Sequence, residues 1–171
     1  MNLTALIDLY HHMEWADACV WRTLLATEKA QADLKLRDYF YHLHMVQRAF
    51  LRVWRGEPRE TPFPKFDNTE ELARWGASYY PEAFAYLESL TEPQLATPFA
   101  MPWASMVEAQ IGRAPDVATA AETILQVALH SLYHRGQVNA RLREVGGEPP
   151  LVDFIAWVWS GRPAAVWPFA L

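Results

Sequence analysis

The stretch HSLYHRGQ (residues 130–137) lies inside a segment, residues 119–146, whose apolar residues recur at every third or fourth position. This spacing predicts an amphipathic helix. Two histidines four residues apart on a helix point the same way, because one turn takes about 3.6 residues. His130 and His134 can therefore present two imidazoles on one face of a rigid backbone. A third His from another helix would complete a set of nitrogen ligands for one metal ion and leave positions open.

The rest of the chain repeats the helical pattern. Apolar residues at helical spacing also mark three further segments, which are residues 3–27, 36–55 and 69–87. Pro81 in the third indicates either a kink or the meeting of two shorter helices. Residues 57–68 hold three prolines and predict an extended connection, and residues 91–116 leave room for a short hairpin without convincing strand alternation. With a short amphipathic piece at 152–159, the pattern predicts an all-α, up-down-type four-helix bundle with an extra C-terminal helix.

Composition restricts the class of protein. The chain has 171 residues, of which 51% are apolar and 20% charged, so we expect one globular domain over residues 1–171. The net charge of -5 disfavours a nucleic-acid-binding protein, because such proteins usually carry a basic surface. Cys19 is the only cysteine, which excludes an intramolecular disulfide and a Cys-rich zinc site, and we expect it in the core. The first residues do not resemble a signal peptide, and no apolar run approaches the ~18 residues of a membrane span, so we expect a cytoplasmic protein without a membrane partner.

The search for a third metal ligand is short, because the chain has six histidines. His42 and His44 lie about 200° apart around a helix, so at most one of them faces the bundle centre. The face of His42 is mostly apolar, whereas the face of His44 carries Gln47, Arg48 and Arg55. We therefore predict His42 as the third ligand and His44 as a surface or rim residue.

Simpler interpretations stand beside the metal site. An isolated His-x-x-x-His pair also occurs as two core histidines that are hydrogen-bonded to their surroundings. His11 or His12 fits a seam between helices or a pocket near the metal. Glu14 and Asp17 fit either a general base near the site or ordinary solvated charges on a helix. The aromatic residues of the loops and tail could line a pocket or a dimer interface; they are Trp103, Trp157, Trp159 and Trp167.

Several pieces of this sequence together resemble a known family. They are YHHMEWAD at residues 10–17, His42 with the aromatic and glycine that follow it up to Gly56, HSLYHRGQ at 130–137, and the LR…G…PP…DFI ending at 142–155. In order and spacing these pieces are similar to the DinB/YfiT-like metalloenzymes, a four-helix-bundle superfamily. It also includes thiol-dependent transferases and mycothiol-dependent maleylpyruvate isomerase. Asp17 stands where the family commonly has Asn.

The resemblance implies a divalent metal ion, zinc or nickel, held by His42, His130 and His134 near one end of the bundle, and a homodimer. It selects His42 over His44 by register. Gly136 inside a helix suggests the close approach of another helix, since glycine there costs about 1 kcal/mol relative to alanine. Gln137 is then placed to hydrogen-bond across the seam or to a ligand histidine.

Two chemistries suit such a site. The metal can acidify a water for hydrolysis, or it can bind a low-molecular-weight thiol as thiolate, which then attacks a small electrophile. The chain shows no Ser or Cys nucleophile motif of its own, which favours a borrowed nucleophile. We predict thiol S-transfer to a small-molecule substrate. A metal-dependent hydrolase and a non-catalytic, stress-related protein stapled by the metal are the alternatives.

Overall fold

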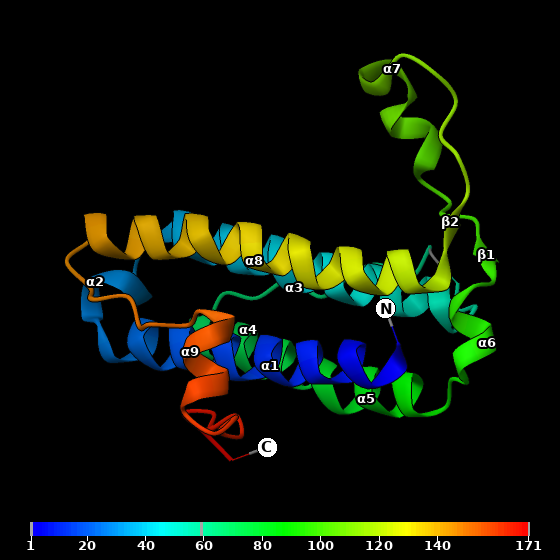
Figure 1. Cartoon of the computed structure of the whole chain (residues 1–171). Helices are drawn as coiled ribbons and strands as arrows, with labels where there is room; N and C mark the ends of the chain where they lie inside the picture. The colour runs from blue at the N-terminus through cyan, green and yellow to red at the C-terminus, as the bar shows by residue number, and fades with distance from the viewer. Residues whose placement is uncertain (1, 59, 171) are drawn as a thin grey trace.

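The structure is a computed structural model that describes residues 2–58 and 60–170. Its long helices lie where the spacing of apolar residues predicts them. The bundle consists of α1 (Leu3–Ala26), α3 (Leu34–Trp54), the consecutive pair α4 (Thr69–Ala77) and α5 (Tyr79–Glu88), and α8 (Ala120–Glu144). Shorter elements connect them: α2 (Glu28–Gln31), α6 (Glu92–Leu95), β1 (Pro98–Phe99), η1 (Ala104–Val107), α7 (Glu108–Ile111), β2 (Ala118–Thr119) and α9 (Phe154–Trp159). The predicted all-α bundle with a short C-terminal helix is confirmed (Figure 1).

Polar side chains fix where the long helices begin. The Asn2 side chain accepts a hydrogen bond from the Ala5 backbone N–H at 2.9 Å, which caps α1. At α8, a capping box between Thr119 and Glu122 is present in both directions. Asp33 caps α3, which begins at Leu34, two residues before the predicted start of that helix. Each cap satisfies backbone N–H groups that have no partner inside the helix.

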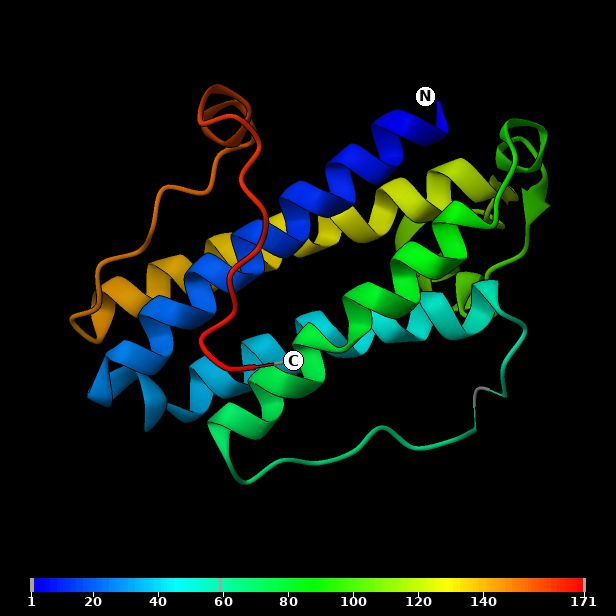
Figure 2. The same cartoon turned by 90° about the horizontal axis from the view of Figure 1, so that it is seen from below.

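The third bundle position is shared by two helices. α4 ends at Ala77 and α5 begins at Tyr79, so two shorter helices meet, and Pro81 lies in the first turn of α5, where no intrahelical N–H donor is needed. The connecting residues 55–58 and 60–68 run back along the bundle before α4 (Figure 2). The pair α4–α5 therefore runs parallel to α3, and the bundle contains one crossover connection in place of strict up-down alternation.

A two-stranded ladder closes one end of the bundle. Pro98 pairs with Thr119 and Phe99 with Ala118, in antiparallel register. The predicted hairpin region thus has strands only at its two edges, with the second strand just beyond residue 116. Between the strands, η1 and α7 project away from the bundle (Figure 1).

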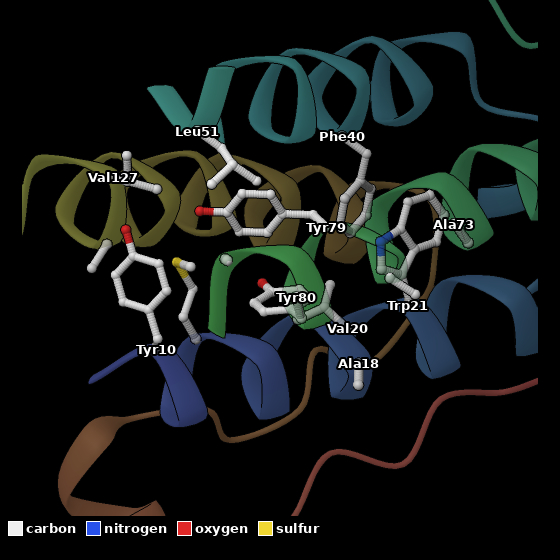
Figure 3. Packing of buried hydrophobic residues seen from close by; sticks show 14 of the residues in the cluster. Tyr10, Ala18, Val20, Trp21, Phe40, Leu51, Ala73, Tyr79, Tyr80 and Val127 are labelled. Atoms are coloured by element: carbon white, nitrogen blue, oxygen red, sulfur yellow. The ribbon is translucent and has the colours of Figure 1, made fainter. Parts of the chain in front are cut away.

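The core between the helices is strongly aromatic. Trp21 on α1 stacks on Phe40 on α3 with ring centroids 3.9 Å apart, and Tyr10, Tyr79 and Tyr80 are fully buried (Figure 3). The Tyr10 hydroxyl donates to the backbone carbonyl of Ile124 on α8 at 3.1 Å.

Across the described residues, no helix has both the length and the apolar character needed to cross a membrane.

Candidate metal centre

Three histidines converge where α3 meets α8. One ring nitrogen from each of His42, His130 and His134 lies within 4.8 Å of the others. The ring centroids of His130 and His134 are 4.3 Å apart, and that of His42 lies 4.5 Å from His134 and 5.4 Å from His130. The structure thus brings together the three residues predicted from the sequence.

The three rings are half-buried on the seam between the two helices and do not lie in the bundle centre. The sequence argument that the apolar face of His42 looks inward is therefore wrong. The buried face of α3 carries His44 and Gln47 instead, and Val46 on the face of His42 is only half-buried. His42 reaches the cluster because α8 packs along that side of α3.

The surroundings of His42 and His130 favour the neutral form of these two rings. Burial, followed by repulsion from His134 and His42, lowers the pKa of His130 to about 4. Burial and then His134 also lower the pKa of His42. A neutral imidazole keeps a lone pair for a metal ion. The Nε2 atom of His130 is buried and has no hydrogen-bond partner among the described residues.

These features fit a divalent metal ion. An unpartnered buried nitrogen is costly, and a metal ion would satisfy it together with the other two lone pairs. In the described part of the chain, no further His, Cys, Asp or Glu joins the three-residue group. Three imidazole nitrogen donors without a fourth protein ligand in the described part of the chain leave coordination positions for other molecules.

Gln137 orients one of the three rings. The Nδ1–H of His134 donates to Oε1 of Gln137 at 2.7 Å, and the amide of Gln137 donates to the hydroxyl of Tyr133 at 3.3 Å. Because Nδ1 carries the proton, the Nε2 lone pair of His134 is free. The predicted hydrogen bond between Gln137 and a histidine of the cluster is present.

Replacing this amide tests whether it tunes the site. We expect Gln137→Leu to weaken divalent-metal binding about 10- to 100-fold, the usual effect of removing a hydrogen-bond partner of a metal-ligating His. Gln137→Glu retains an acceptor oxygen and serves as the matched control, with affinity close to that of the parent protein. Competition with a chromogenic chelator measures both affinities. Equal affinity in the Leu variant would contradict the orienting role.

His44 is not the rim residue predicted from the sequence. It is fully buried, and both ring nitrogens are occupied: Nε2 accepts from the indole N–H of Trp21 at 2.9 Å, and Nδ1 donates to Oε1 of Gln47 at 2.8 Å. Burial lowers the pKa of His44, in keeping with a neutral ring. The ring packs so closely on α4 that a Cβ on Gly76 would overlap it. A histidine with both nitrogens satisfied is a structural residue and leaves no lone pair for a metal.

Asp17 is neither solvated nor part of the three-His cluster. It is fully buried, forms an ion pair with Arg135 and accepts a hydrogen bond from the hydroxyl of Tyr80. The amide of Gln47 donates to it at 3.1 Å and also lies 3.1 Å from the hydroxyl of Ser131. These five residues form a buried polar network that joins α1, α3, α5 and α8. The proposed role of Asp17 as a general base at the metal centre has no support in this geometry.

Comparison with known protein families shows to which family the chain belongs. The sequence pattern described as the DinB family matches residues 1–163. The chain belongs to the DinB family. Comparisons with curated proteins and with solved structures gave no match. The predicted resemblance is thereby confirmed over nearly the whole length of the sequence.

Other predictions within this DinB-family chain have mixed outcomes. Cys19 is buried as expected. His12 lies at a seam, where its Nε2 is 2.9 Å from the carbonyl oxygen of Val152, whereas His11 is exposed and stacks on Phe84. Gly136 is also exposed, and apart from its chain neighbours and the backbone of its own helix no atom lies within 4 Å of a Cβ placed there. The expected close approach of another helix at Gly136 is therefore wrong.

Proposed function

We propose that this DinB-family protein is a metal-dependent enzyme that transfers a low-molecular-weight thiol to a small electrophile. His42, His130 and His134 hold one divalent ion, zinc or nickel. The observation that carries the proposal is the convergence of three ring nitrogens without a fourth protein ligand in the described part of the chain. An ion in such a site acts as a Lewis acid and stabilises an anionic ligand such as a thiolate.

The environment of the single cysteine supports a nucleophile that comes from a separate thiol molecule. The single cysteine, Cys19, lies on α1 and is buried, and burial raises the pKa of its thiol. A protonated, buried thiol is a poor nucleophile. The sulfur that attacks the electrophile therefore comes from a separate thiol: it forms a carbon–sulfur bond while the leaving group departs with the thiol proton. A reducing compartment keeps such thiols available, so we place the protein in the cytoplasm.

Exposed apolar side chains support a homodimer as part of the same proposal. Leu129 and Leu132 on α8 are about half exposed, at 51% and 53%, and they line a groove with Phe154 of α9. An apolar face of this kind on a single chain is typical of a protein–protein contact. A second copy of the chain, packed through α8, would cover it.

Native mass spectrometry of untagged protein tests the proposal. We expect one zinc or nickel ion per chain, carried on a dimer, and identified by elemental analysis. Titration of the cobalt-substituted protein with small thiols should then produce a thiolate charge-transfer absorption band. A bound metal without a thiolate band would overturn S-transfer and favour hydrolysis or a structural role. Protein that binds no metal after reconstitution would overturn the metal centre itself.

A further inference from the structure

A groove opens beside the three-His cluster and extends to the segment between β1 and β2. Its volume is about 490 Å³, and the rings of His42 and His130 form part of its wall. This volume lies within the range of about 300–1,000 Å³ that small-molecule sites occupy. The groove is therefore large enough for a small ligand in direct contact with two of the three histidines.

The walls of the groove come from three separate parts of the chain, and α8 contributes Gln126 and His130. On α3, Met45, Val46 and Ala49 follow His42 at spacings of three, four and seven residues, so they share its helix face. The facing wall comes from the projecting segment, with Trp103 before η1 and Met106 within η1. Part of the apolar face of His42, which the sequence led us to place toward the bundle centre, is thus one side of this groove.

The chemistry of the lining selects an apolar occupant. None of the described residues that line the groove is an Asp, Glu, Lys or Arg, and apart from the two histidines the polar side chain among them is Gln126. A charged ligand group would lose water there without gaining a partner. Phe50 and Trp103 meet edge to face with ring centroids 5.0 Å apart, and the thioethers of Met45 and Met106 suit contact with an aromatic ring.

One wall is incompletely covered. Met106 is 78% exposed although its side chain lines the groove. An exposed apolar side chain beside an uncharged groove gains from any ligand that removes both from water. The gain is available to a small molecule that enters from the solvent side.

We infer that this groove binds the apolar part of the substrate, and that the substrate class is small uncharged molecules with an aromatic or branched aliphatic group. Its reacting end then lies at His42 and His130. This inference rests on the proposed metal centre for the position of the reacting end, but the binding of the apolar group depends on the groove alone.

The first experiment examines the groove without metal. Benzyl alcohol is titrated into the metal-free protein, whose methionine methyl groups carry ¹³C, and NMR spectra are recorded. We expect the resonances of Met45 and Met106 to shift together, while Met13, which is buried in the core, stays unchanged. No shift, or equal shifts at Met13, would overturn the inference whether or not the protein binds metal. Shifts that follow protein concentration in place of ligand concentration would assign the groove to a second copy of the chain and would also overturn it.

Paired variants locate the binding. Met106→Glu places a charge in the groove at an exposed position, and we expect it to weaken benzyl alcohol binding about tenfold or more, because burying a phenyl group is worth at least that factor. Ile111→Glu is the matched control: Ile111 is also exposed and lies on α7 of the same projecting segment, outside the groove lining. Equal weakening by both variants would overturn the inference.

A pair of hydroxamates connects the groove to the cluster. With metal bound, benzohydroxamate should bind the parent protein about tenfold more tightly than acetohydroxamate, and Met106→Glu should remove that difference. Equal affinities in the parent protein would overturn the placement of the reacting end. If benzyl alcohol binds but no metal does, the groove stands and the proposed function fails, so the two failures are distinguishable.

Discussion

His134→Ala and His130→Ala are each expected to abolish stoichiometric metal binding while the helical bundle stays folded. Each variant removes one of three donors whose ring nitrogens lie within 4.8 Å of one another. Two imidazoles that remain give a weaker site, and the loss of affinity should exceed the 10- to 100-fold that follows from losing a hydrogen-bond partner alone. Both rings are half-buried on the helix seam, so we expect the free energy of unfolding to fall by about 1 kcal/mol or less.

Elemental analysis after dialysis measures the bound metal, and circular dichroism during urea unfolding measures the stability. His11→Ala is the matched control, because His11 is an exposed histidine on α1 and lies outside the cluster. It should retain one metal ion per chain. Metal retained at full stoichiometry in both His130→Ala and His134→Ala would refute the three-His site.

The helices and the histidine pair on α8 could be predicted because their signals are local. Asn2 and the Thr119–Glu122 box act on backbone N–H groups within one turn, and the spacing of His130 and His134 fixes their common direction on α8. Each of these features depends on residues close in the sequence. Their outcomes in the structure agree with the sequence interpretation.

The burial of the polar residues His44 and Gln47 on α3 could not be predicted, because partners far away in the sequence make it possible. His44 and Gln47 appear polar in a helical pattern, yet both are fully buried. Trp21 donates to His44, and Gln47 donates to Asp17, so residues on another helix compensate for burial. Placing the face of His42 toward the bundle centre was therefore wrong, although the apolar residues Phe40, Leu43 and Phe50 of α3 are buried.

The position of the projecting segment between β1 and β2 also depends on contacts with residues that are distant in the sequence. The prolines of this segment leave room for a short hairpin without convincing strand alternation, and nothing local indicates that Trp103 meets Phe50 beside the histidines. The sequence feature that could have indicated the groove is the row of apolar residues Met45, Val46 and Ala49, which follows His42 on one helix face. That row has the spacing of a core face and also the spacing of a groove wall, so the sequence alone leaves the choice open.

Asp17→Asn is expected to destabilise the fold by about 3–5 kcal/mol, the effect of breaking a buried ion pair by removing one charge. Asp17 is fully buried and Arg135 is 2% exposed, so the guanidinium would remain in the core without a counter-charge. The Nε of Arg135 already has no partner among the described residues, which leaves little to compensate the loss. Chemical unfolding followed by circular dichroism measures the change.

An exposed ion pair serves as the control for the loss of stability expected from breaking the buried one. Asp116 forms an ion pair with Arg113 at 2.6 Å, and both side chains are largely exposed, so Asp116→Asn should change stability by less than about 1 kcal/mol. If Asp17→Asn does not fold, the double variant Asp17→Leu/Arg135→Met keeps the prediction testable, because removing both charges should restore a folded protein. Similar small losses for Asp17→Asn and Asp116→Asn would refute a structural role for the buried pair.

The same experiment separates the two functions of α8. Ser131 and Arg135 each follow a histidine of the cluster by one residue, which turns them about 100° around the helix and into the core. The buried pair of Arg135 and Asp17 therefore lies on a face of α8 separate from the face that carries His130 and His134. We expect Asp17→Asn protein that remains folded at low temperature to retain one metal ion per chain, whereas His134→Ala loses the metal and keeps its stability. Loss of both properties in both variants would show that the network and the cluster form one unit.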